Sequence, residues 1–298
     1  MALPDEIRSA CARVAAAARK VEIVPEAIAP YASGLDPAPP EPAEQPYEAP
    51  ERGAAHLLQL DAVNFGSGWF PTLRKPPGLS GFRTVERGLL ARGPWTAGDL
   101  VSVDAAECAD VFGQDREHPL MARFAGALNE LGAAVEREHD GAFLALARAG
   151  DGSAVALAQR LARLATWADV STYDDAPVPF FKRAQLAAAD LHRHGLAPAD
   201  DLGALTLMAD NLVPHVLRID GVLRFDPDLV ERIDREELLD HGSAEEVEIR
   251  ACAVHAVELL VAAHGATTAA AVDDILWRRG GAPRYKAHPR HRARTTAY

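Results

Sequence analysis

Apolar residues recur every three to four positions along most of the chain, which is the spacing of one face of an α-helix. The clearest case is the stretch 119–139, where five apolar residues form one stripe: Leu120, Phe124, Leu128, Leu131 and Val135. Similar spacing, or an alanine-rich composition, predicts further helices at 5–20, 82–92, 142–148, 153–165, 226–237, 243–264 and 268–278. Because the alternation typical of strands is nearly absent, we predict a mainly α fold.

The region before the main helical part departs from this pattern. Residues 36–53, DPAPPEPAEQPYEAPERG, are rich in Pro and Glu, a composition that predicts an extended connector instead of a packed element. Residues 57–65 predict a short strand that enters a glycine-rich loop, so we expect one small β element within residues 57–82. Apart from the connector, we expect residues 1–298 to form a single catalytic unit of helical lobes.

Residues 180–217 predict two helices joined by the polar turn APADD. The first helix is alanine-rich and stops at Gly195, a residue type that commonly ends helices. The second carries an apolar stripe and contains Asp210, which Pro214 follows four residues later. A proline inside a helix crowds the carbonyl of residue i−4, so we expect a kink beside Asp210. Such a kink can aim a side chain into a pocket, although many kinks are only structural.

The residues alone leave the role of this segment open. Lys182 stands at the start of the first helix and Asp210 inside the second. A lone lysine near a helix start, or a lone aspartate within a helix, is most often a solvated surface residue. The other interpretation is that the two side chains form a functional pair.

Composition and charge narrow the classes of function. The chain has 298 residues, 48% of them hydrophobic, and a formal net charge of −12, which suits a soluble globular protein. Binding along a nucleic acid needs many Lys and Arg contacts to phosphates, so we expect no stable nucleic acid partner. A few local cations still suffice for a small anionic ligand.

The cysteines and the N-terminus bear on metals and localisation. Cys11, Cys108 and Cys252 stand outside any CxxC or Cys/His cluster, which argues against structural zinc and a disulfide framework. His192 and His194 are expected at the surface and not on a metal. The N-terminal region has no apolar core of signal length, and no apolar run reaches the roughly 18 residues of a membrane span. We therefore expect a soluble, cytoplasmic protein without a membrane partner.

Several motifs occur in a specific order. FFKRAQ (180–185), MADNLVPHVL (208–217) and EEVEIRACAVHAVELL (245–260) are preceded by DAVNFGSGWFP and LSGF, and the chain ends in HPRHRARTTAY. Together these motifs resemble the queuosine salvage protein family, the queuosine 5′-phosphate N-glycosylases, over roughly residues 55–298. The string Glu-Val-Glu-Ile-Arg is the most specific of them.

The resemblance implies a concrete activity. The family has a largely helical fold similar to DNA glycosylases of the helix-hairpin-helix type. It hydrolyses the N-glycosidic bond of queuosine 5′-monophosphate, a 7-deazaguanine nucleotide, to queuine and ribose 5-phosphate, and it requires no metal or organic cofactor. The implied partner is thus a small-molecule nucleotide, and we expect the protein to be a monomer.

The family's paired Lys and Asp match Lys182 and Asp210, which the resemblance implies are catalytic. Cleavage of an N-glycosidic bond builds positive charge on the ribose, and a fixed carboxylate stabilises such a centre. Asp210 is assigned this role, and it can also orient or deprotonate the attacking water. Lys182 can hold the carboxylate ionised, or contact the phosphate or a ribose hydroxyl.

The resemblance also implies substrate contacts, each with a structural alternative. The candidates for binding the base are the carboxylate of Asp61, the amide of Asn64 and two rings that can stack on the base, those of Phe65 and Trp69. The structural alternative is that the aromatic residues form a buried cluster. Phe181 and Asn211 adjoin the catalytic pair. Glu248 and Arg250 contact the substrate or form a structural ion pair. A basic segment binds the 5′-phosphate or is a frayed tail: Arg290, His291 and Arg292.

Three positions depart from the family pattern. Phe82 and Arg83 stand where the family often has Tyr-Trp, and Asn211 stands where many members have Tyr. These changes leave open another 7-deazapurine nucleotide or a nucleoside as substrate. A base-excision glycosylase for DNA or RNA and a non-catalytic nucleotide-binding protein are the remaining alternatives, and the acidic charge argues against the first.

Overall fold

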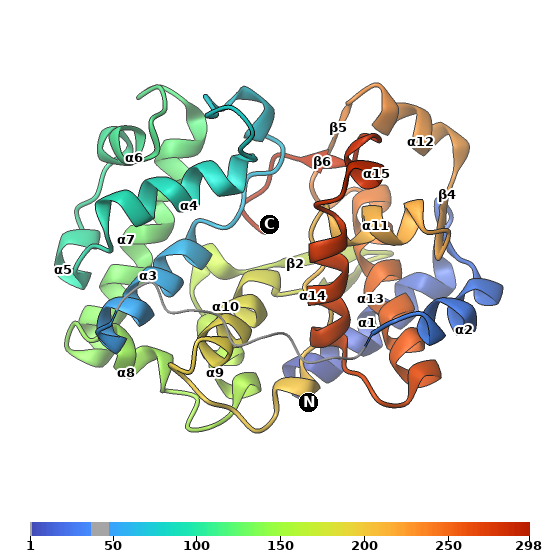
Figure 1. Ribbon diagram of the computed structural model, residues 1–298, viewed down its shortest axis with the longest axis horizontal. Coiled ribbons are helices and arrows are strands. Elements are labelled where there is room, and N and C mark those ends of the chain that lie inside the picture. The colour runs from blue at the N-terminus through green and yellow to red at the C-terminus, as the bar shows by residue number, and fades with distance from the viewer. Residues whose placement is uncertain (1, 37–47) are drawn as a thin grey trace. The chain divides into compact units, whose positions relative to one another are not determined.

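The computed structural model describes residues 2–36 and 48–298 and is mainly helical (Figure 1), as predicted. It divides into two compact units. The first unit consists of residues 2–36, 169–182 and 201–294, and the second of residues 48–168, 183–200 and 295–298. That the whole chain acts as one catalytic unit stays a prediction.

The first unit is built around α13 (Ala244–His264), which is predicted correctly from its sequence. Its neighbours in this unit are α1, α2, α11 and α14 (Figure 1). Apolar and alanine residues occupy all sides of α13, so it is buried around most of its circumference, as expected for a core helix. The other helices are α1 (Leu3–Ala17), α2 (Pro25–Ser33), η3 (Leu202–Ala204), α11 (Val213–Ile219), α12 (Pro227–Asp234), α14 (Ala269–Arg279) and α15 (Pro283–Lys286).

Three two-stranded sheets complete the first unit. Strands β1 (Val21–Ile23) and β4 (Leu223–Phe225) pair antiparallel, with Val21 opposite Phe225. The hairpin of β2 (Val170–Tyr173) and β3 (Ala176–Pro179) leads into the FFKRAQ motif. Strands β5 (Leu238–Leu239) and β6 (Arg292–Ala293) pair in parallel. The last pair anchors the basic C-terminal segment beside the chain that precedes α13.

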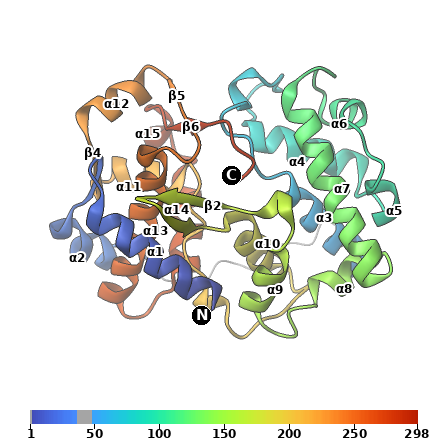
Figure 2. The ribbon, with the colours of Figure 1, turned by 180° about the vertical axis from the view of Figure 1, so that it is seen from behind.

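The second unit is helical throughout its described elements. α7 (Pro119–His139) is its longest helix, and it packs against α3, α5, α6 and α8 (Figure 2). The elements are α3 (Pro50–Ala62), η1 (Phe70–Thr72), α4 (Gly81–Arg92), α5 (Ala97–Leu100), α6 (Ala105–Phe112), α7, α8 (Phe143–Ala147), α9 (Ala154–Leu161), η2 (Ala165–Trp167) and α10 (Lys182–Arg193). The apolar stripe predicted along 120–135 is the buried face of α7.

The predicted β element at 57–82 is wrong. α3 runs from Pro50 to Ala62, and its residues from 53 to 62 are all buried. A short apolar run that is buried on every side has no visible period, so helix and strand cannot be told apart from the sequence. Pro50 in the first helical turn is the overlooked start signal. The connector predicted at 36–53 therefore ends before Pro50, and residues 37–47 lie outside the described chain.

The continuous second helix predicted up to residue 217, with a kink at Pro214, is also wrong. Only η3 forms at its start, an extended stretch follows, and α11 begins at Val213. The N–H of Met208 donates to Oδ1 of Asp273 at 3.0 Å, a tertiary contact that holds the stretch open. Pro214 lies in the first turn of α11, where a missing N–H costs nothing.

Across the described residues, the search for membrane spans finds no single helix that is long and apolar enough to cross a bilayer. α13 and α14 meet the test of length and composition only as a pair, which is bent by 112° at the break between them.

Candidate active site

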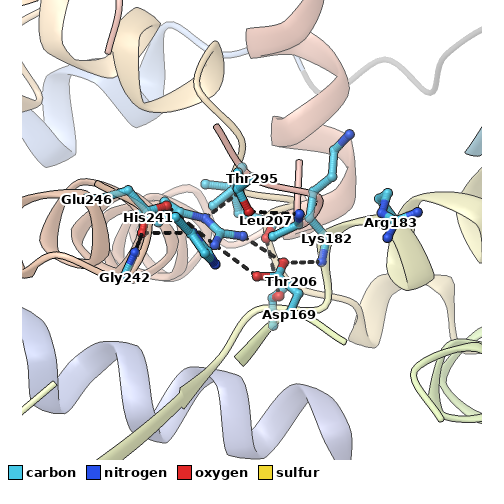
Figure 3. Close-up of polar contacts among 12 residues, drawn as sticks. Asp169, Lys182, Arg183, Thr206, Leu207, His241, Gly242, Glu246 and Thr295 are labelled. Atoms are coloured by element: carbon cyan, nitrogen blue, oxygen red, sulfur yellow. Dashed lines mark hydrogen bonds and ion pairs between the residues drawn. The ribbon is translucent and has the colours of Figure 1, made fainter. Parts of the chain in front are cut away.

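Lys182, the first residue of α10, is buried. It is 5% exposed, and its main-chain N–H donates to Oδ2 of Asp169 at 3.0 Å (Figure 3). The carbonyl of Asp169 accepts from the N–H groups of Phe180 and Phe181. Phe181 has a left-handed backbone with φ of 48°, a strained conformation for a bulky residue that is enriched at functional sites. The alternative of a solvated surface lysine is therefore wrong.

Arg250, on α13, connects this turn to the segment that carries Asp210. Its guanidinium is fully buried and donates to both carboxylate oxygens of Asp169, at 2.9 and 2.7 Å. Its Nε donates to the carbonyl of Ala209 at 3.0 Å. The guanidinium also stacks on the ring of Phe180, 3.9 Å from its centroid. Arg250 thus forms an ion pair with Asp169, and not the one suggested with Glu248.

Glu246 supports Arg250 from one helical turn earlier. Its Oε1 lies 3.7 Å from Nη1 of Arg250, and its Oε2 accepts from the N–H of Gly242 at 3.0 Å (Figure 3). Burial opposes ionisation of Glu246, but His241, Arg250 and the Gly242 N–H outweigh it and lower the pKa to about 2. Glu246 is therefore an anion at neutral pH that balances the buried Arg250.

Asp210 binds main-chain N–H groups at the start of α11. Its Oδ1 accepts from the N–H of Leu212 at 2.6 Å and from that of Val213 at 3.1 Å. The residue is half-buried, and its Oδ2 makes no hydrogen bond to any described residue. One oxygen thus fixes the carboxylate to the helix, and the other remains available to a substrate.

Arg290 lies close enough to Asp210 for their charges to interact. Burial lowers the pKa of the Arg290 guanidinium, and the Asp210 carboxylate partly offsets this effect. Arg290 is half-buried, and no described residue forms a hydrogen bond or ion pair with it. A partly desolvated guanidinium whose donors bind no described residue is well suited to a phosphate.

The next two residues, His291 and Arg292, differ from Arg290. Burial lowers the pKa of His291 to about 4, so this imidazole is neutral at pH 7. The carbonyl of His291 accepts from Nδ2 of Asn211 at 3.3 Å. Arg292 pairs with Glu236 at 3.0 Å and belongs to β6. The segment is therefore a built part of the first unit and not a frayed tail.

Glu248 ties α13 to the chain that follows α1. Its Oε2 accepts from the N–H groups of Arg19, Lys20 and Val21 at 3.0, 2.6 and 3.1 Å. Its Oε1 accepts from the hydroxyl of Tyr173 at 2.8 Å. Both oxygens are thus committed to the fold, which accounts for a buried carboxylate at this position.

The base-binding candidates lie in the second unit, in and after the C-terminal end of α3. Asp61, Phe65 and Trp69 are 1%, 1% and 4% exposed, while Asn64 is half-buried. The ring of Phe65 meets Phe124 edge-on, with centroids 5.1 Å apart. Phe65 thus belongs to a buried aromatic cluster with Phe124 and Phe112, and a role of the four candidates in base binding stays a prediction.

Arg183 holds this part of the second unit in place. It is 1% exposed, and its Nη1 donates to the carbonyl of Ala62 at 2.6 Å. Its guanidinium lies over the ring of Phe65 at 4.8 Å and over that of Trp167 at 5.2 Å. Lys182 and Arg183, adjacent in the FFKRAQ motif, thus serve the first and the second unit respectively.

Phe82 and Arg83, which depart from the family pattern, are accommodated within α4. Both residues lie in the first turn of α4. The guanidinium of Arg83 pairs with Glu86 at 2.6 Å on the same helix, and it lies 5.7 Å from the centroid of the Phe82 ring. The added charge of Arg83 therefore has a counter-ion.

Comparison with known proteins places this geometry in a family. A family model described as "Queuosine salvage protein" matches residues 84–298. The chain belongs to the queuosine salvage protein family. The matched region contains Lys182, Asp210 and Arg290, whereas residues 61–69 precede it.

Relatives of the family extend over most of the chain. A "Queuosine 5′-phosphate N-glycosylase/hydrolase" from Sphaerobacter thermophilus is 36% identical over 262 residues, which cover 82% of this chain and 81% of the relative. A protein of the same name from Dictyostelium discoideum is 30% identical over 263 residues, 83% of this chain and 79% of the relative. The resemblance inferred from the motifs is therefore confirmed.

Sequence reasoning missed Asp169, the residue that joins Arg250 to Lys182. Its only local signal is its place just before β2, and its partner Arg250 lies 81 positions later. No motif or spacing in a single sequence indicates such a pair. Within the described chain, no three His, Cys, Asp or Glu side chains gather in a way that could hold a metal ion.

Proposed function

We propose that this chain hydrolyses the N-glycosidic bond of queuosine 5′-phosphate and releases queuine and ribose 5-phosphate. One observation carries the proposal: Asp210 keeps one carboxylate oxygen available, and the half-buried Arg290, close enough for their charges to interact, forms no hydrogen bond or ion pair with a described residue. The pair offers an anion for the ribose and a cation for the phosphate of one nucleotide. Relatives that bear this activity in their name cover most of the chain.

The chemistry follows from the place of Asp210. As the bond between C1′ and the base nitrogen breaks, its electron pair leaves with the base and positive charge develops on the ribose. Oδ2 of Asp210 stabilises this charge and accepts a proton from the attacking water, whose oxygen bonds to C1′. The departing nitrogen takes up a proton, so that water is divided between the two products. Oδ1 stays bound to the N–H groups of Leu212 and Val213 and keeps the carboxylate in a fixed orientation.

Arg290 accounts for a preference for the 5′-phosphate. A guanidinium binds a phosphate through parallel charge-assisted hydrogen bonds, and Arg290 has its donors available among the described residues. Lys182 adds a second positive charge near the start of α10. Asp61, Asn64, Phe65 and Trp69 remain our candidates for contact with the base.

Incubation with three substrates tests the function. We would measure released base by mass spectrometry after incubation with queuosine 5′-phosphate, queuosine and GMP. The proposal expects rapid release of queuine from the 5′-phosphate and release about 10- to 100-fold slower from queuosine, because the phosphate contact is worth about 1.5–3 kcal/mol. It expects no guanine from GMP, because the base pocket adds further selection. Tight binding of the 5′-phosphate without any release would instead make the protein a nucleotide-binding protein.

We further propose that the enzyme is a cytoplasmic monomer that does not bind nucleic acid. Its net charge of −12 opposes contact with a polyanion. Light scattering on the purified protein tests the monomeric state, and a shift assay with duplex DNA at low salt tests nucleic acid binding; a dimer or a shifted band would overturn the respective point.

A further inference from the structure

We propose that the buried ion pair of Asp169 and Arg250 sets the places of both Lys182 and Asp210. This inference rests on the proposed function, because that function makes Lys182 and Asp210 the reacting side chains. Asp169 and Arg250 are positioning residues in this account: each one acts through the main chain beside a functional residue and not on the substrate.

Asp169 holds the segment from 180 to 182 at three points. Its carbonyl accepts from the N–H groups of Phe180 and Phe181, at 2.9 and 3.4 Å, and its Oδ2 accepts from the N–H of Lys182 at 3.0 Å. Between these contacts lies the left-handed backbone of Phe181. Such a conformation costs about 1–3 kcal/mol and persists only where the surroundings impose it. Asp169 supplies these constraints and thereby fixes the main chain of residues 180–182.

Arg250 holds the segment before Asp210. Its Nε donates to the carbonyl of Ala209 at 3.0 Å, while its two terminal nitrogens bind Asp169 at 2.9 and 2.7 Å. The planar guanidinium has a fixed fork of donors, so the three contacts share one rigid plane. Arg250 is 0% exposed, and its base on α13 is part of the core. The same rigid guanidinium therefore holds both the main chain next to Asp210 and the Asp169 carboxylate, which binds the N–H of Lys182.

Stability alone does not explain this ion pair. Removing two charges from water is costly, and apolar residues of similar volume often serve a core equally well. Apolar residues in place of Asp169 and Arg250 could not, however, bind a main-chain N–H on one segment and a main-chain carbonyl on another. The benefit of the pair is thus geometric, and a misplacement of about 1 Å at reacting groups can cost roughly 100-fold in rate.

Three variants test the inference. Asp169→Asn keeps the volume but loses the pairing with Arg250. Arg250→Lys keeps both buried charges but cannot donate to Asp169 and Ala209 in one plane. Asp220→Asn is the matched control: this carboxylate of the same unit has a side chain that is 7% exposed and accepts from Tyr31 and Tyr285. It has no contact with the segments of Lys182 or Asp210 among the described hydrogen bonds.

The first readout is catalytic. With queuosine 5′-phosphate, Asp169→Asn and Arg250→Lys are each expected to lower kcat about 10- to 100-fold while KM changes less than about threefold, because misplaced reacting groups slow the chemical step without removing binding contacts. Asp220→Asn is expected to lower the melting temperature but to leave kcat within about twofold. A folded Asp169→Asn variant with normal kcat overturns the inference. If that variant does not fold, Arg250→Lys decides by the same criterion.

The second readout needs no substrate. Amide hydrogen exchange at residues 180–182 and 209–213 is expected to accelerate at least about tenfold in Asp169→Asn and Arg250→Lys, and to stay at the wild-type rate in Asp220→Asn. Unchanged exchange in these segments overturns the inference, whatever the activity. If the wild-type protein releases no queuine, the proposed function fails, and the exchange data still decide whether the ion pair positions the two segments.

Discussion

At the scale of single residues, the candidate site is defined by how each charge is satisfied. Arg250, Asp169 and Glu248 are fully occupied by protein partners. Asp210 keeps one oxygen available, and Arg290 has no described partner. The two side chains with unused capacity are thus the ones that a nucleotide can engage.

Arg290→Met is expected to abolish the preference for the phosphorylated substrate. Methionine fills a similar volume without charge, so the variant loses a charge-assisted contact worth about 1.5–3 kcal/mol. We expect KM for queuosine 5′-phosphate to rise about 10- to 100-fold, with little effect on the slow reaction of queuosine. Steady-state kinetics on both substrates measures this change.

Arg294→Met is the matched control for Arg290. Arg294 belongs to the same basic segment but is exposed, so its loss should change KM for queuosine 5′-phosphate less than about twofold. Equal effects of the two variants would show that the segment acts only through its overall charge.

The sequence was enough to single out the candidate residues, but not to predict which partners they would bind. Lys182 and Asp210 stand in recognisable motifs, and the motifs identified them. The pairing of Arg250 with Asp169, and of Glu248 with the N–H groups of residues 19–21, joins positions far apart in the chain. Such pairs depend on how the elements pack, which no local pattern encodes.

At the scale of elements, Glu248 makes α13 the anchor of the first unit. Glu248→Gln is expected to lower the free energy of unfolding by about 1.5–3 kcal/mol, because the neutral amide weakens the three N–H contacts made by Oε2, and its NH2 group cannot accept from the Tyr173 hydroxyl. Glu245→Gln on the same helix is the control, since Glu245 is partly exposed and pairs with Arg232; a change below about 1 kcal/mol is expected. Urea unfolding measures both, and equal losses would contradict the role of Glu248.

Two glycines of α7 provide a matched test of packing. A Cβ at Gly132 would lie 2.5 Å from Cβ of Leu100 and 2.8 Å from the carbonyl oxygen of Ala97, whereas a Cβ at Gly126 would have no atom within 4 Å. Gly132→Ala should therefore destabilise the protein by about 1–3 kcal/mol. Gly126→Ala should stabilise it by about 0.5–1 kcal/mol, because alanine favours the helix. Thermal unfolding with shifts of the same sign would contradict the close contact of α5 with α7.

The elements differ in how well the sequence predicts them. α7 and α13 are long enough for their composition and the spacing of their apolar residues to distinguish helix from strand. The stretch 202–212 has apolar residues at helical spacing, yet residues 205–210 are extended because Asp273 and Arg250 bind their main chain. There, tertiary contacts outweigh local preference.

At the scale of the whole molecule, buried histidines couple stability to pH. Burial lowers the pKa of His56, His215 and His291 from 6.5 to about 4 in each case. Between pH 6.5 and 4 the unfolded chain binds protons at these sites and the folded chain does not, so the free energy of unfolding falls as the pH falls. Their stabilising contribution is complete above pH 6.5 and is lost toward pH 4.

We expect the free energy of unfolding to drop by up to about 1.4 kcal/mol per pH unit for each histidine. Glu246, whose pKa is lowered to about 2, loses its contribution only below its unfolded value of about 4.5, so the histidines account for the change between pH 6.5 and 5. Urea unfolding at pH 7.5, 6.0 and 5.0 measures the slope, and a His215→Gln variant should reduce it. A flat profile in this range would contradict the neutral state of the buried imidazoles.

The central claim is that Asp210 drives hydrolysis of queuosine 5′-phosphate, and its most direct test is the rate of queuine release by wild-type protein and by Asp210→Asn. We expect equal amounts of queuine and ribose 5-phosphate from the wild type. We expect release about 100- to 1000-fold slower from Asp210→Asn, the loss that follows when a group that stabilises transition-state charge is removed. The Asp220→Asn control should keep the wild-type rate. Queuine release by Asp210→Asn at the wild-type rate, from a correctly folded variant, would contradict the account.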